Sequence, residues 1–171
     1  MKSSILLITT TILLLAGCVY ESPLTEKNTI SIDPAVLGLW EPVPNDGEKA
    51  DPNERMLVMN YSNTEYFIHH PVGKNGIYWR GYPIKIGGVS CVQLKALGTD
   101  EGPVPPSEKE LFQVVSYRMS KGHLIVKTLN ADLITNKLKG SDELKKAFLN
   151  HQDNENLFSD PSRFKKILSD N

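Results

Sequence analysis

A group of aromatic residues with one arginine is the clearest candidate for chemistry in this sequence: Tyr66, Tyr78, Arg80 and Tyr82. Successive residues of a β-strand point to opposite faces, so Tyr78, Arg80 and Tyr82 would share one face. An arginine beside aromatic rings in a cleft suits an amphipathic or anionic ligand with a carboxylate or phosphate headgroup. Aromatic residues also dominate ordinary β-sheet cores, so the alternative is that the tyrosines pack in the core and Arg80 lies in solvent.

The residues that would indicate a metal site or an enzyme are poorly placed. His69 and His70 are adjacent, and neighbouring residues on a strand cannot chelate one ion without a bend. The run Gly88-Val89-Ser90-Cys91-Val92 lacks the closing glycine of a hydrolase nucleophile elbow. We therefore predict no catalytic residue, no metal, no cofactor and no enzymatic activity.

Cys91 has two interpretations, a reactive nucleophile or a small buried hydrophobic residue. A reactive thiol needs an electropositive, partly open setting. Because Cys91 lies in an apolar, β-rich run, we expect it to be buried and unreactive.

Length and composition limit the class of protein. The chain has 171 residues, of which 40% are hydrophobic and 23% charged, with a formal net charge of -1. These values fit one globular domain and exclude collagen-like, heptad-repeat and wholly disordered chains. A near-neutral charge also argues against a nucleic-acid partner.

The N-terminus has the pattern of a secretory signal. Lys2 is followed by an apolar run over residues 5–15, which is too short to cross a bilayer because a spanning helix needs about 20 apolar residues. Small residues then precede a cysteine in Leu15-Ala16-Gly17-Cys18, which resembles the lipobox of bacterial lipoproteins.

This resemblance implies that residues 1–17 are a lipoprotein signal peptide and that Cys18 carries diacylglyceryl and usually amide-linked palmitate chains. More than one acyl chain gives stable membrane anchoring. In that family an aspartate after the lipidated cysteine favours retention in the inner membrane, whereas Val19 stands here. The expected location is therefore the periplasmic face of the outer membrane.

For the rest of the chain we predict two parts. Residues 18–35 are the lipidated cysteine and a flexible tether, and residues 36–171 are a single periplasmic domain. Seven short runs alternate in β fashion, with Gly87-Gly88 as a two-residue turn between two of them: residues 37–43, 55–61, 64–70, 77–86, 89–97, 111–119 and 123–129. Two helices are predicted afterwards, one capped by Ser141 and one that begins at Asp160-Pro161. The predicted fold is α+β, an antiparallel meander sheet or partial barrel of about seven strands followed by two C-terminal helices.

Two further resemblances concern the folded domain. Gly38-Leu39-Trp40 resembles the G-x-W at the start of lipocalins, which implies a tryptophan at the barrel floor with an arginine from a late strand packed over it. Arg118 is the residue we expect to supply that cation–π contact. The alternative is simply a buried tryptophan. The stretch from Leu144 to Asp160 resembles the tail of uncharacterised periplasmic lipoproteins, a likeness that implies the layout and no activity.

Two functions remain from the sequence. The preferred hypothesis is a membrane-anchored lipoprotein with a non-catalytic envelope role, protein interaction or scaffolding. The alternative is a lipocalin-like carrier of a small amphipathic or anionic ligand, bound by Tyr66, Tyr78, Arg80 and Tyr82. A closed pocket of several hundred Å3 would favour the carrier, and a filled core would favour the interaction protein.

Overall fold

The structure is a computed structural model that describes residues 19–44, 49–73, 75–105 and 110–167. The lipobox residues, Leu15 to Cys18, lie outside the described residues. Within the described ranges, no helix is long and apolar enough to cross a bilayer.

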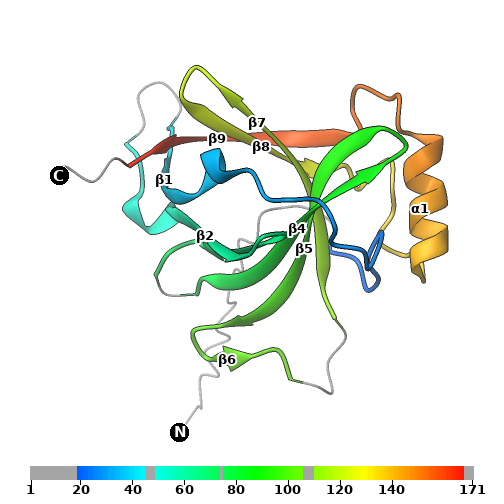
Figure 1. The fold of residues 1–171 in the computed structure, drawn as a ribbon, viewed down its shortest axis with the longest axis horizontal. Helices are drawn as coiled ribbons and strands as arrows, with labels where there is room; N and C mark the ends of the chain where they lie inside the picture. Colours follow the sequence, from blue (N-terminus) through cyan, green and yellow to red (C-terminus); the bar gives the residue numbers. More distant parts are fainter. Residues whose placement is uncertain (1–18, 45–48, 74, 106–109, 168–171) are drawn as a thin grey trace, which may run out of the picture.

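One antiparallel sheet of nine strands dominates the described chain (Figure 1). The pairing of β4 with β5 closes the sheet into a ring of eight strands, to which the two-residue β6 is added beside β5. Going round, the ring runs β1-β2-β3-β4-β5-β7-β8-β9 and returns to β1. The strands are β1 (Gly38–Pro42), β2 (Met56–Ser62), β3 (Glu65–His70), β4 (Ile77–Ile86), β5 (Val89–Thr99), β6 (Gly102–Pro103), β7 (Phe112–Ser120), β8 (His123–Leu129) and β9 (Phe158–Lys166).

The seven predicted strands are all present within a residue or two, and the β4–β5 hairpin turns at Gly87-Gly88 as expected. Both glycines have positive φ, 56° and 87°, which glycine adopts without a steric cost. The shorter helical elements are 3-10 turns, η1 (Pro34–Val36) and η2 (Pro52–Glu54).

The predicted second C-terminal helix is wrong, and with it the α+β class with two helices. Residues Phe158–Lys166 form β9, which pairs with β8 on one side and β1 on the other. A helix here would have left two long strand edges unpaired, and closing the ring satisfies both. Pro161 is tolerated because it lies where the β8–β9 register shifts, so its missing N–H costs no ladder bond.

The predicted first helix is present as α1 (Ser141–Asn150) and buries Leu144 and Phe148 as its periodicity indicated. Its cap is different from the prediction. Gly140 occupies the N-cap position, and Ser141 is the first helical residue.

The segment predicted to be a flexible tether instead packs on the sheet. Tyr20 and Leu24 are almost fully buried, with 1% and 2% of their surface exposed. Figure 1 shows this segment in blue, running from the side of α1 across β4 and β5 toward β1. We call residues 20–28 the strap. Buried apolar side chains hold it in place, so it is part of the folded unit.

Two hydrophobic clusters lie on the two sides of the ring wall. All eight ring strands contribute to the interior cluster, whose members are Val36, Trp40, Met56, Val58, Tyr66, Trp79, Val92, Leu94, Ala96, Val115, Leu124 and Phe164. The second cluster lies outside the ring, where the strap, α1 and the segment before it cover the sheet. Its members are Tyr20, Leu24, Tyr82, Ile84, Ile86, Cys91, Phe112, Val114, Leu129, Ile134, Leu144, Phe148 and Leu157.

Trp40 is fully buried in the interior cluster, but Arg118 does not supply the cation above it. Lys166 of β9 lies over the Trp40 ring instead, with its Nζ 5.4 Å from the ring centroid. Arg118 is exposed on β7. Gly38 has φ +131°, so a side chain there would be strained, and a Cβ would lie 2.7 Å from Lys166 Cε and displace the end of that lysine.

Candidate functional site

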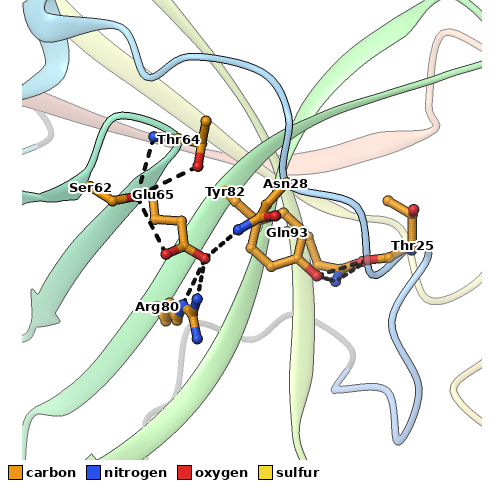
Figure 2. Close-up of polar contacts among 8 residues, drawn as sticks. All are labelled: Thr25, Asn28, Ser62, Thr64, Glu65, Arg80, Tyr82 and Gln93. Atoms are coloured by element: carbon orange, nitrogen blue, oxygen red, sulfur yellow. Dashed lines mark hydrogen bonds and ion pairs between the residues drawn. The ribbon is translucent and has the colours of Figure 1, made fainter.

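The strap is fixed by the amide of Gln93, a side chain with 0% exposure in the middle of β5. Gln93 Oε1 accepts from the backbone N–H of Leu24 at 2.6 Å and of Thr25 at 3.3 Å. Gln93 Nε2 donates to the Thr25 carbonyl at 3.0 Å and to the Tyr82 hydroxyl (Figure 2). The side-chain amide therefore bonds the strap much as a neighbouring strand would.

Tyr82 belongs to the same network and faces the strap, outside the ring. Its hydroxyl donates to the Thr25 carbonyl at 2.8 Å. Burial raises the pKa of the Tyr82 phenol, which keeps the proton that this bond requires.

Arg80, the predicted anion-binding residue, already has a carboxylate partner. Its Nε donates to Glu65 Oε1 at 2.8 Å, and its terminal nitrogen lies 2.5 Å from the same oxygen. Glu65 is 4% exposed and also accepts from Asn28 Nδ2 of the strap at 2.7 Å. Figure 2 shows Asn28 and Arg80 converging on this carboxylate. The ion pair neutralises Arg80 and removes the main reason to expect an anionic ligand there.

Tyr66 and Tyr82 do not flank one cavity. Tyr66 belongs to the interior cluster, where its hydroxyl accepts from the Asp33 backbone N–H at 2.7 Å. Tyr82 belongs to the outer cluster. The ring wall separates them, because Tyr66 pairs with Gly81 and the next residue, Tyr82, points the other way.

Tyr78 lies on a partly exposed surface made by the outward side chains of β2, β3 and β4. We call this surface the aromatic face; it consists of Met59, Tyr61, Phe67, His69 and Tyr78. The Tyr78 ring lies 4.2 Å from His69 in a stacked arrangement and 5.7 Å from Phe67, centroid to centroid. Met59 is 42% exposed and Tyr61 57%.

Arg80 connects the aromatic face to the Glu65 ion pair. Its guanidinium carbon lies 5.4 Å from the centroid of the Tyr61 ring. The Arg80 guanidinium thus contacts the Tyr61 ring and the buried Glu65 carboxylate at the same time.

The two adjacent histidines point to opposite sides of the ring wall, as strand alternation predicts. His70 packs edge-on against Phe164, and burial lowers its pKa to about 4, so it is neutral at neutral pH. Burial also lowers the pKa of His69. In the described part of the chain, no three His, Cys, Asp or Glu side chains are grouped as a metal ion would require.

Cys91 is buried as expected, with 3% exposure in the outer cluster. Burial raises the pKa of its thiol to about 12, which leaves a negligible fraction as the reactive thiolate.

The two best-formed hollows over the described residues lie away from the predicted ligand residues. One, of about 440 Å3, is open to solvent and lined by Glu21, Ser22, Glu110, Lys139 and Gly140. The other, of about 230 Å3, lies against β7 and β8 and is lined by Ser116, Tyr117, Arg118, Ile125 and Lys127. Neither is lined by Tyr66, Tyr78, Arg80 or Tyr82, although Tyr117 of the second hollow also packs against the interior cluster.

No motif in the sequence pointed to Gln93, Glu65 or the strap. The signal available for the strap was Tyr20 and Leu24, because they are large apolar residues in an otherwise polar segment.

Comparisons of this chain with family models, curated proteins and solved structures give no match.

Two buried glutamines allow a matched test of the strap. Gln93 is fully bonded, whereas both amide atoms of Gln113, 1% exposed, have no hydrogen-bond partner among the described residues. Gln93→Met should lower the free energy of unfolding by about 2–4 kcal/mol, because the Leu24 N–H loses its buried acceptor and the Thr25 carbonyl loses one of its two donors. Gln113→Met should be neutral or stabilising. Urea unfolding followed by tryptophan fluorescence measures both, and equal losses in the two variants would contradict the role given to Gln93.

Proposed function

We propose that this protein is a lipoprotein anchored through Cys18 to the periplasmic face of the outer membrane, where it binds a partner protein and does not catalyse a reaction. The anchoring rests on the short apolar run and on Leu15-Ala16-Gly17-Cys18 at its end. The location rests on Val19, which stands where an inner-membrane lipoprotein would carry aspartate.

The cluster of buried side chains inside the ring is the observation that favours protein interaction over ligand carriage. Large side chains from several strands, Trp40, Tyr66 and Trp79 among them, belong to one cluster and are almost fully buried. A carrier needs a cavity of roughly 300 Å3 or more to enclose a small molecule. Three of the four predicted ligand residues, Tyr66, Arg80 and Tyr82, instead make polar contacts within the protein.

The aromatic face is the surface that fits a protein partner best. Tyrosine, arginine and methionine are enriched at protein interfaces, and rigid aromatic anchors often dominate binding energy. The face carries little net charge, because His69 has a lowered pKa and Arg80 is paired with Glu65. It is therefore complementary to an apolar protein surface and not to an anionic ligand.

Closure of the ring also determines how a partner can bind. Strands β2, β3 and β4 each pair on both sides, so their edges cannot accept an added strand. The partner must contact the side chains of the aromatic face.

Lipid attachment is tested directly by metabolic labelling with an alkyne analogue of palmitate. The wild-type protein should be labelled and Cys18→Ser should not, because the sulfur that accepts the diacylglyceryl group is absent. Cys91→Ser is the matched control and should keep the label, since Cys91 is buried in the fold. Labelling that persists in Cys18→Ser would refute the anchor.

The interaction is tested by a photoreactive amino acid placed at Tyr61 or, as a control, at Leu149 of α1, which is also an exposed apolar residue. Irradiation of living cells should give one discrete protein adduct from position 61 and none from position 149. The partner identified by mass spectrometry should bind the purified protein, and Met59→Ser combined with Tyr61→Ser should weaken that binding at least tenfold, about 1.4 kcal/mol. Unchanged affinity in that variant would show that the aromatic face is not the interface.

A further inference from the structure

The first residue of the strap is fixed to the ring wall. Tyr20 and Phe112 exchange two backbone hydrogen bonds, each 2.8 Å, as neighbouring strand residues do. The Tyr20 hydroxyl donates to the Ile134 carbonyl at 2.8 Å, and the side chain is 1% exposed. The chain is therefore anchored to the start of β7 from Tyr20 onward.

Very little chain separates this fixed point from Cys18. Val19 is the single residue between them. Two Cα–Cα steps reach at most about 7 Å, whereas a free tether over residues 18–35 would have reached on the order of 50–60 Å. An acyl group on Cys18 would thus hold the start of β7 within a short distance of the lipid headgroups.

The aromatic face lies on the opposite side of the ring. From β7, the strand β2 is the fourth neighbour in either direction round the ring. The strand register agrees with this count of four strands. From one strand to the next, the paired outward residues are Phe112, Lys95, Arg80, Phe67 and Met59. Met59 and Phe112 therefore lie half a turn apart.

We infer that the strap orients the anchored protein, with the outer side of β7 against the lipid bilayer and the aromatic face turned away from it. The inference rests on the proposed acylation of Cys18. Its consequence is that the protein works within its own diameter of the membrane, and that the partner approaches from the aqueous side.

Two matched exposed residues report this orientation in the full-length acylated protein. Leu111 next to Phe112 is 38% exposed and Met59 is 42% exposed. Each is replaced by cysteine and nitroxide-labelled, with Cys91 buried and the Cys18 sulfur acylated. The protein is bound to phosphatidylethanolamine–phosphatidylglycerol vesicles that contain a nickel-chelating lipid. Spin relaxation by nickel should be several-fold greater at position 111 than at position 59. Equal relaxation, or greater relaxation at position 59, would overturn the orientation.

A control variant tests whether the short link causes the orientation. Fifteen glycine and serine residues inserted between Val19 and Tyr20 add a linker with an end-to-end distance on the order of 20 Å. Relaxation at position 111 should then fall toward that at position 59, and a retained difference would overturn the role of the short link. Intact mass separates the two proposals: an unacylated chain refutes the anchor and the orientation together, whereas an acylated chain with equal relaxation refutes the orientation alone.

Discussion

Gln93 uses both ends of its side-chain amide to hold a segment almost seventy positions earlier in the sequence. A buried amide that lost these partners would carry the full cost of desolvation, so the strap and β5 are mutually dependent. The outer face of β4 and β5 is covered because the strap lies there. Asn28 reaches Glu65 for the same reason, and the start of the strap reaches β7. The bonds to Gln93 therefore fix the path that residues 20–28 take across the sheet, including their contacts with Glu65 and Phe112.

Closure of the ring gives the protein its second constraint. β9 pairs with β8 and β1 and leaves no long unpaired edge between them. Closure also brings inward side chains from every ring strand into one buried cluster. The surface available for recognition is consequently the outside of the wall, where the strap and α1 cover one part and the aromatic face remains partly exposed.

Local patterns were enough to predict seven strands and α1. The alternation of apolar and polar residues, the glycines at turns and the helical spacing of apolar residues all involve residues that are close in the sequence. β9 was not predicted because Asp160-Pro161 is a good local start for a helix. The segment forms a strand because it pairs with β1 and β8, which are distant in the sequence. The same holds for Trp40, whose cation is Lys166 from the far end of the chain and not Arg118.

The candidate site was predicted only in part. Tyr66, Tyr78, Arg80 and Tyr82 do lie on neighbouring strands, but alternation could not reveal that the wall separates Tyr66 from Tyr82. Nor could it reveal that Glu65 neutralises Arg80, since that contact needs the register of β3 on β4 and the strap above it. The strap was predicted to be a tether because the residues that hold it lie on β5 and β7, far away in the sequence, where no local pattern reveals them.

Hydrogen exchange at the backbone amide of Leu24, followed by NMR or mass spectrometry, tests the central claim most directly. If the strap is part of the folded unit, this amide is protected nearly as well as those of β5, since it is bonded to a fully buried side chain. Exchange at the rate of an unstructured peptide would show that residues 20–28 form a free tether and would contradict the account.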